Sequence, residues 1–188
     1  MIRIVFVILF SSISLLPLKA QDFEVVTGKS VIIDGKSSFG RFACDFEAIN
    51  ENDTIYFNST KSRDQLILDI NLPVDEFGCG NRMLNRDFNK TLQSSEYPFI
   101  HVLVERFFKE GNHYFSSLRL KLVGKELYME KLPFIMEEGV DFDSKFLVAD
   151  FSLNLRYFDL EPPKKFLGLI KVHEELNIRL KLGIMDHY

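Results

Sequence analysis

Alternation of apolar and polar residues is the strongest pattern in this 188-residue chain. It is clearest in the stretches 117–122, 147–157 and 176–184, and one face of 66–72 shows it as well. Every second residue is apolar there, and most residues between them are polar. This is the pattern of a strand with one face in a core and the other in water. The chain is therefore predicted to be an all-β protein with antiparallel sheet.

Shorter strands are predicted between these stretches, with turn sequences separating them. The strands are expected near 23–27, 30–33, 40–47, 54–57, 99–108 and 127–135. Gly, Pro, Asn, Asp and Ser accumulate in the expected turns, at 34–38, 50–53, 109–112, 137–139 and 161–165. Many short strands at this spacing are typical of a sandwich or barrel. Closure into a barrel would also remove exposed sheet edges.

The segment 72–100 interrupts the alternation. Apolar residues recur there at helical spacing with polar residues around them, which predicts one short amphipathic helix near 81–94. The apolar stripe of this helix consists of Met83, Leu84, Phe88 and Leu92. Gly80 or Asn81 can start the helix. Pro98 prevents its continuation, because the residue before a proline disfavours helical geometry.

The first twenty residues have the features of a secretory signal peptide. Arg3 supplies a basic start, an apolar region runs from Ile4 to Leu16, and the small residue Ala20 suits a cleavage site. An uncleaved N-terminal anchor is the alternative, but the apolar run is short for a bilayer span. We therefore predict cleavage after Ala20, a single domain over 21–188, no stable membrane span, and a periplasmic or secreted location.

The net charge argues against nucleic acid as a partner. Cleavage removes Arg3 and Lys19 from the 23 basic residues, which leaves 21 against 27 acidic residues and a formal charge of −6. An acidic protein repels the phosphate backbone. The chain also has 19 Phe and no Trp. Phe has no polar atom to satisfy, so it suits a fully apolar interior.

Both cysteines, Cys44 and Cys79, lie in the part predicted to be exported. In an oxidising compartment two cysteines pair more readily than they bind a metal. No histidine cluster is near them to complete a zinc site, and they do not form a C-x-x-C redox motif. We predict a structural disulfide, which stabilises by roughly 3–4 kcal/mol in the chain-entropy model.

Signatures of catalysis are weak. The four histidines, His101, His113, His173 and His187, lack metal-binding helical spacing. There is no G-x-S-x-G motif and no phosphate-binding glycine loop. Asp141 and Asp143 are two nearby carboxylates, but they follow Glu137-Glu138-Gly139 and fit a solvated loop. We predict no enzyme activity, no metal site and no cofactor.

Three segments together resemble the YceI-like family. In "DINLPVDEFGCGNRMLNRDFNKTLQSSEYPFI", residues 69–100, a strand leads into a short helix and returns through a Tyr-Pro-x-Ile sequence. "VIIDGKSSFGRFACDFE", residues 31–47, resembles the family's hairpin and F-x-C strand. Residues 151–182 resemble its last hairpin, with Pro162-Pro163 in the loop. The resemblance covers about residues 25 to 184, and the cysteine pair resembles an envelope subgroup of the family.

One element departs from the family pattern. Many members carry a T-x-x-G-V-T-K type sequence at the central hairpin, where this chain has Val123-Gly124-Lys125. Any role that depends on the side chains of that element is therefore not carried over to this chain.

The resemblance implies a lipocalin-like antiparallel barrel of about eight strands that holds polyisoprenoids or other long apolar molecules. It also implies that the helix lies beside the barrel mouth, with Cys79 fastened to the strand Phe42–Phe46 through Cys44. The expected function is that of an exported lipid- or polyisoprenoid-binding protein, a carrier or sequestering protein without chemistry. The alternative is a packed barrel that serves as a structural or protein-interaction module in the cell envelope.

The inward-facing apolar residues are the candidates for ligand contact: Leu68, Ile70, Leu120, Leu122, Phe151, Leu153, Leu155, Ile178 and Leu180. Strands of eight to ten residues span roughly 26–34 Å, which suits a long-chain apolar ligand such as an isoprenoid or a fatty acid. The same residues fit a filled core equally well.

Basic residues at the mouth are candidates for a polar head group: Lys164 and Lys165 in the last hairpin, and Arg82 and Arg86 in the helix. Solvated charges are the alternative for each of them. A second basic set should face outward, because its strand neighbours face inward: Arg119, Lys121, Arg179 and Lys181.

Overall fold

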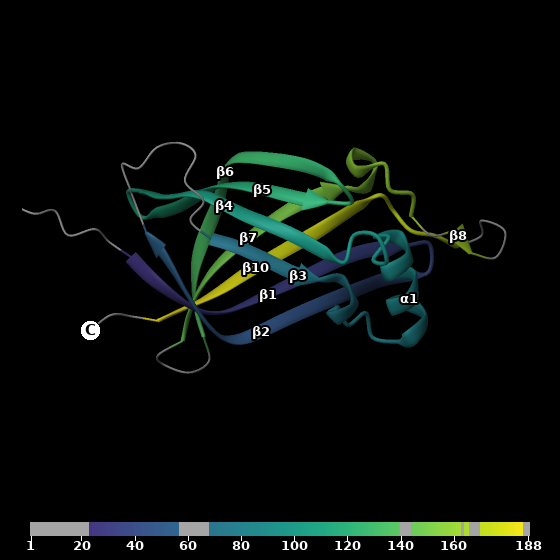
Figure 1. The fold of residues 1–188 in the computed structure, drawn as a ribbon, viewed down its shortest axis with the longest axis horizontal. Coiled ribbons are helices and arrows are strands. Elements are labelled where there is room, and N and C mark those ends of the chain that lie inside the picture. The colour runs from purple at the N-terminus through teal and green to yellow at the C-terminus, as the bar shows by residue number, and fades with distance from the viewer. Residues whose placement is uncertain (1–22, 57–67, 140–143, 163, 166–169, 186–188) are drawn as a thin grey trace, which may run out of the picture.

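Eight antiparallel strands form one curled sheet around an apolar core in the computed structural model of this chain (Figure 1). The structure describes residues 23–56, 68–139, 144–162, 164–165 and 170–185. Over these residues the predicted all-β fold with one α-helix is confirmed.

The chain order of the elements is as follows: β1 (Phe23–Ser37), β2 (Gly40–Tyr56), β3 (Leu68–Pro73), the 3₁₀ turn η1 (Val74–Glu76), α1 (Arg82–Thr91), β4 (Phe99–Glu110), β5 (His113–Leu122), β6 (Lys125–Glu138), β7 (Lys145–Asn154), the 3₁₀ turn η2 (Leu155–Phe158), β8 (Lys164–Lys165), β9 (Ile170–Lys171) and β10 (Glu175–Met185). The strand order across the sheet is β2-β1-β10-β7-β6-β5-β4-β3, so β2 and β3 are the edges. The strands β8 and β9 form a separate two-stranded ribbon.

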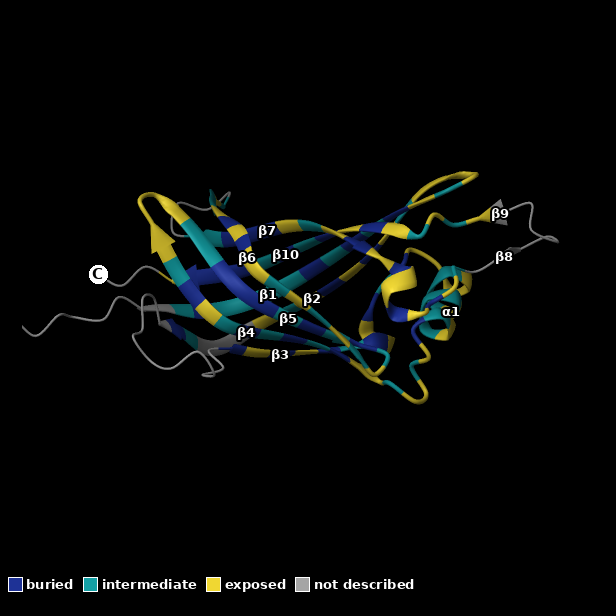
Figure 2. Ribbon diagram, turned by 90° about the horizontal axis from the view of Figure 1, so that it is seen from above, coloured by how far each residue is buried: buried dark blue, intermediate teal, exposed yellow. Residues whose placement is uncertain are grey.

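Alternation along the strands places the apolar side chains in the core. In β10, Leu176, Ile178, Leu180 and Leu182 are buried, while Asn177 between them is exposed. Figure 2 shows the same change between buried and exposed residues along several strands. Burial of a Leu or Ile side chain contributes about 1.5–3 kcal/mol, so a register slip by one residue would expose the whole stripe.

The first two strands are longer than predicted. Two expected strands, 23–27 and 30–33, merge in β1, and the pair 40–47 and 54–57 merges in β2. The predicted turn at 50–53 is therefore wrong, since these residues belong to β2. The pairing of β1 with β2 changes register at this point, since Val26 pairs with Asp53 but Gly28 pairs with Ile49. The extra residues of β2 lie in this irregular part of the ladder. An edge strand tolerates such polar residues and bulges, because one of its sides has no neighbouring strand.

The strand β7 ends earlier than the alternation through Tyr157 predicted. The side chain of Asn154 accepts a hydrogen bond from the backbone nitrogen of Arg156 at 2.9 Å and starts η2. Asn and Asp favour such local turns over continued sheet pairing. As a result Leu155 stays buried at 3% exposure, whereas Tyr157 turns outward and is 52% exposed.

The helix α1 lies at one end of the curled sheet, and the end of β10 lies at the opposite end (Figure 1). Asn81 is the N-cap residue, and its side chain accepts hydrogen bonds from the nitrogens of Met83 and Leu84, both at 3.0 Å. This agrees with the predicted start and with the expected helix near 81–94. Within the described residues, no helix has the length and apolar character that a bilayer crossing requires.

Candidate functional site

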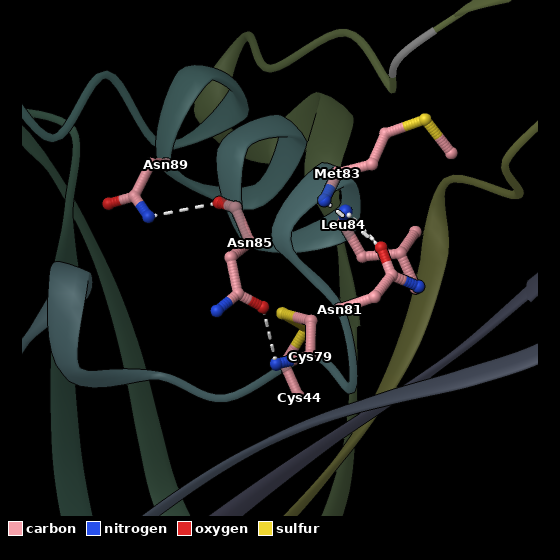
Figure 3. The surroundings of a disulfide bond; sticks show 7 residues. All are labelled: Cys44, Cys79, Asn81, Met83, Leu84, Asn85 and Asn89. Atoms are coloured by element: carbon pink, nitrogen blue, oxygen red, sulfur yellow. Dashed lines mark hydrogen bonds between the residues drawn. A yellow bond between two sulfur atoms is a disulfide. The ribbon is translucent and has the colours of Figure 1, made fainter.

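A disulfide joins Cys44 of the edge strand β2 to Cys79, which lies between η1 and α1 (Figure 3). The predicted pairing is confirmed. The neighbouring residues Asp45 and Gly78 exchange two backbone hydrogen bonds, with nitrogen-to-oxygen distances of 2.9 and 2.8 Å. The segment after η1 is thereby fixed to β2 immediately before the helix begins.

A side chain of α1 ties the helix to the disulfide-bonded residue Cys79. The side-chain oxygen of Asn85 accepts a hydrogen bond from the backbone nitrogen of Cys79 at 2.8 Å (Figure 3). On the apolar side, the Phe88 ring lies 5.1 Å from the Phe77 ring, and the Phe77 ring lies 5.5 Å from that of Phe46. Both polar and aromatic contacts therefore position α1 over the end of the sheet.

A pocket of about 300 Å³, here called the outer pocket, opens between the β1–β2 hairpin, α1 and the segments around η2 and β10. Apolar side chains dominate its lining, with Ser37, Arg41, Asp87 and Thr91 as the polar members. The lining residues are Ile33, Ser37, Phe39, Gly40, Arg41, Phe42, Cys44, Met83, Leu84, Asp87, Phe88, Thr91, Leu92, Leu155, Val172 and Leu176.

A second space, here called the inner cavity, lies deeper between the strands and has a volume of about 60 Å³. Every residue around it is apolar. They are Val31, Ile33, Leu72, Phe88, Leu92, Ile100, Val102, Leu120, Leu122, Phe151, Leu153, Leu155, Leu176, Ile178 and Leu180.

The two spaces share five lining residues: Ile33, Phe88, Leu92, Leu155 and Leu176. These five residues border both spaces, which therefore adjoin each other, and they are here called the partition. Phe88 belongs to α1, and Leu92 is its C-cap residue.

Seven of the nine predicted contact residues surround the inner cavity: Leu120, Leu122, Phe151, Leu153, Leu155, Ile178 and Leu180. Leu155 also lines the outer pocket. Leu68 and Ile70 are buried in the core and line neither space. For all nine residues, contact with a ligand stays a prediction.

Sequence reasoning missed most of the outer pocket. The helix is expected beside the barrel mouth, but none of its residues is among the nine predicted ligand contacts, although Met83, Leu84, Phe88 and Leu92 line this pocket. Phe42 lines it from β2, and its ring covers Gly35 so closely that a Cβ atom there would lie 2.2 Å away. The F-x-C pattern marked Phe42, but nothing in it distinguishes a pocket wall from a core residue.

Basic residues near the pocket are solvated. Arg82 and Arg86 are exposed on α1, and the Arg41 guanidinium, with its side chain 65% exposed, lies 3.9 Å from Asp34. Lys164 and Lys165 are also predicted to contact a head group, but their side chains lie outside the part of the chain that the structure describes. The loop carboxylates Asp141 and Asp143 and the C-terminal His187 also lie outside the described residues.

Three members of the second basic set make ion pairs on the outer face, and the Lys181 nitrogen lies 3.8 Å from the centroid of the Phe146 ring. Arg119 lies 2.6 Å from Glu105, Lys121 lies 2.9 Å from Glu126, and Arg179 pairs with Asp150 at 3.2 Å. The hydrogen bond from Lys121 lowers the pKa of the Glu126 carboxyl, with further help from the charge of Arg119. These groups serve the solvated surface and do not line the outer pocket or the inner cavity.

In the described part of the chain, no group of three or more His, Cys, Asp or Glu residues is placed to hold a metal ion. The outer pocket offers a mostly apolar lining with four polar residues, Ser37, Arg41, Asp87 and Thr91, which suits burial of a hydrocarbon.

Comparison with known proteins by sequence yields no match, either to a protein-family model or to a curated protein. Comparison of structures does yield matches. A polyisoprenoid-binding domain from Saccharophagus degradans, implicated in plant cell wall breakdown, superposes with a TM-score of 0.62 at 10% identity and covers 89% of this chain and all of its own. BcnA from Burkholderia cenocepacia superposes with a TM-score of 0.54 at 14% identity, covering 82% of this chain and 95% of its own.

A third solved structure, a mutant of the Campylobacter jejuni YceI protein, superposes with a TM-score of 0.50 at 11% identity over 64% of this chain and 72% of its own. At these identities the likeness is one of fold. The curled antiparallel sheet, the helix at its end and these superpositions agree with the resemblance found in the sequence: the chain has the fold of the YceI-like proteins.

Proposed function

We propose that this protein is a YceI-like binding protein that holds an apolar chain molecule at the helix end of its sheet, as a carrier or sequestering protein without chemistry. The observation that carries the proposal is the outer pocket, an apolar space of about 300 Å³ beside α1. It contacts the inner cavity through a shared apolar partition.

The volume of the outer pocket suits a ligand of moderate size. Ligand sites commonly measure about 300–1,000 Å³, so this pocket lies at the lower end. An apolar cavity of about 150 Å³ holds one benzene molecule, and on that scale the outer pocket accommodates roughly twelve carbon atoms.

Burial of hydrocarbon supplies the affinity in this proposal. Each buried methylene contributes about 0.8 kcal/mol, so ten of them contribute about 8 kcal/mol. That free energy corresponds to a Kd of about 1 μM before the cost of association is subtracted. We expect micromolar or weaker binding for a plain hydrocarbon chain, with any tighter binding due to polar contacts at the rim.

The structural neighbours support an isoprenoid as the ligand class. The Saccharophagus degradans domain is a polyisoprenoid-binding domain and shares the fold over its whole length. An isoprenoid is branched and apolar, and the lining of the outer pocket offers aliphatic and aromatic side chains for such a chain. Fatty acids and fatty alcohols present the same chemistry and belong to the same proposal.

Export is part of the proposal. Residues 1–20 would direct the chain out of the cytoplasm and be removed, leaving 21–188 as the working domain. The disulfide between Cys44 and Cys79 supports this location, because such bonds persist in oxidising compartments.

A packed barrel that acts through its outer surface is the second candidate. The size of the inner cavity favours it, since about 60 Å³ is less than half of the space that benzene occupies in an apolar cavity. In this alternative the pocket beside α1 is a surface depression, and partner proteins contact the ion-paired outer face.

Native mass spectrometry of the exported protein, purified without detergent, separates the two functions. A stoichiometric adduct that organic extraction releases as an isoprenoid or fatty compound would establish the binding function. If the protein keeps its apo mass after isoprenoid alcohols and fatty acids are offered, the packed barrel becomes the better description.

A further inference from the structure

The partition between the outer pocket and the inner cavity carries an inference about ligand length, which rests on the function proposed above. Phe88 and Leu92 line both spaces and come from α1 and its C-cap, and these two residues are here called the floor of the outer pocket. An apolar chain that extends from the outer pocket towards the inner cavity passes beside them.

Packing and hydrogen bonds hold the floor residues, Phe88 and Leu92, in place. Leu92 is only 5% exposed, and the Phe88 ring packs against that of Phe77 at 5.1 Å. The helix that carries Phe88 is capped by Asn81 and tied through Asn85 to Cys79, which is itself cross-linked to β2. Side chains on an element fixed at several points move less readily than those on a free loop.

The two volumes set the expected limit. The outer pocket, at about 300 Å³, holds roughly twelve carbon atoms when scaled from a benzene-sized cavity of about 150 Å³. The inner cavity, at about 60 Å³, is too small on the same scale for a further five-carbon isoprene unit. A longer chain must leave its end in water or displace the floor.

We propose that Phe88 and Leu92 limit the length of chain that is buried, so that the protein binds a segment of roughly ten to fifteen carbons of an isoprenoid or fatty chain and gains nothing from carbons beyond it. The neighbouring apolar walls bind the chain, and these two side chains stop it. Shortening them joins the pocket to the inner cavity and extends the chain that fits.

The test is a length series of isoprenoid alcohols, geraniol, farnesol and geranylgeraniol, offered below their solubility limits to the disulfide-bonded exported protein. Binding is measured by displacement of an environment-sensitive fluorophore and checked by native mass spectrometry. For the unmodified protein, affinity should rise from geraniol to farnesol and then stay level. For Phe88→Ala, geranylgeraniol should bind at least tenfold more tightly than farnesol.

Matched controls separate length selection from general loosening of the core. Phe134→Ala removes a phenyl ring that is 3% exposed and lines neither space, so it should leave the length profile unchanged. Phe88→Leu serves if Phe88→Ala does not fold, and should show a smaller shift towards geranylgeraniol. Leu92→Phe enlarges the floor and should move the preference towards geraniol.

The outcomes distinguish the two proposals. If the unmodified protein binds none of the alcohols, the proposed function fails and the length limit fails with it. If it binds them but the folded Phe88 and Leu92 variants keep its length profile, the binding function stands and the floor role is wrong. A profile in the unmodified protein that continues to rise through geranylgeraniol also overturns the floor role.

Discussion

The side-chain oxygen of Asn85 accepts a hydrogen bond from the backbone nitrogen of Cys79 at 2.8 Å. This bond links the second turn of α1 to the residue that carries the disulfide. The position of the helix therefore depends on the disulfide-bonded segment that carries Cys79. The shape of the outer pocket depends on both, because residues of α1 and Cys44 line it.

Asn85→Ala should destabilise the protein by about 1–3 kcal/mol, because it leaves a part-buried backbone N–H without an acceptor. Urea denaturation followed by circular dichroism measures the loss. Asn177→Ala is the matched control, since Asn177 accepts an exposed hydrogen bond from Ser152 at 3.1 Å. A loss no larger than that of the control would show that the bond to Cys79 contributes little.

Removal of the disulfide should cost about 3–4 kcal/mol in the chain-entropy model, given the sequence separation of 35 between Cys44 and Cys79. The double variant Cys44→Ala/Cys79→Ala and the reduced protein should unfold at similar, lower denaturant concentrations. Reductant should have no effect on the double variant. A loss under about 1 kcal/mol would contradict the model and indicate that the Asp45–Gly78 bridge holds the closure alone.

Met83→Gln should weaken binding of a fluorescent fatty-acid analogue several-fold while leaving stability within about 0.5 kcal/mol. Met83 lines the outer pocket and is 52% exposed, so its apolar side chain is available to a ligand without being part of the core. Met185→Gln is a close control, because Met185 is 53% exposed and is the last residue of β10, which ends at the opposite end of the sheet from α1. If both variants weakened binding of the analogue equally, the result would argue against binding in the outer pocket.

Lys121→Met should raise the pKa of Glu126 towards its ordinary value of 4.5, because the largest cause of the lowered pKa is the hydrogen bond from Lys121. A carboxyl whose folded pKa is lowered stabilises the fold above its unfolded pKa, and this contribution disappears as the pH falls through the folded pKa. The stability difference between the two proteins should therefore be present at neutral pH and vanish in acid. NMR titration of the Glu126 carboxyl checks the shift, and an unchanged midpoint would contradict the assigned cause.

Local patterns were sufficient for most elements of the fold. The alternation in 176–184 predicted β10, and Asn81 marked the start of α1, which ends at Thr91, three residues before the expected end near 94. These signals are local, because side-chain periodicity and cap chemistry depend on residues a few positions apart. The turn expected at 50–53 was wrong because pairing with β1 decides whether polar residues stay in a strand, and the residues themselves do not show that pairing.

The sequence by itself determined that the chain forms antiparallel strands around an apolar core, with one short helix and two cysteines available to pair. Only the tertiary structure decided that Phe88 and Leu92 separate an outer pocket from an inner cavity. In the sequence these two residues belong to the same apolar stripe as any core-facing helix. Whether an apolar side chain fills a core or bounds a space depends on what lies opposite it. Here that is Ile33, Leu155 and Leu176, residues brought to the helix from distant parts of the chain.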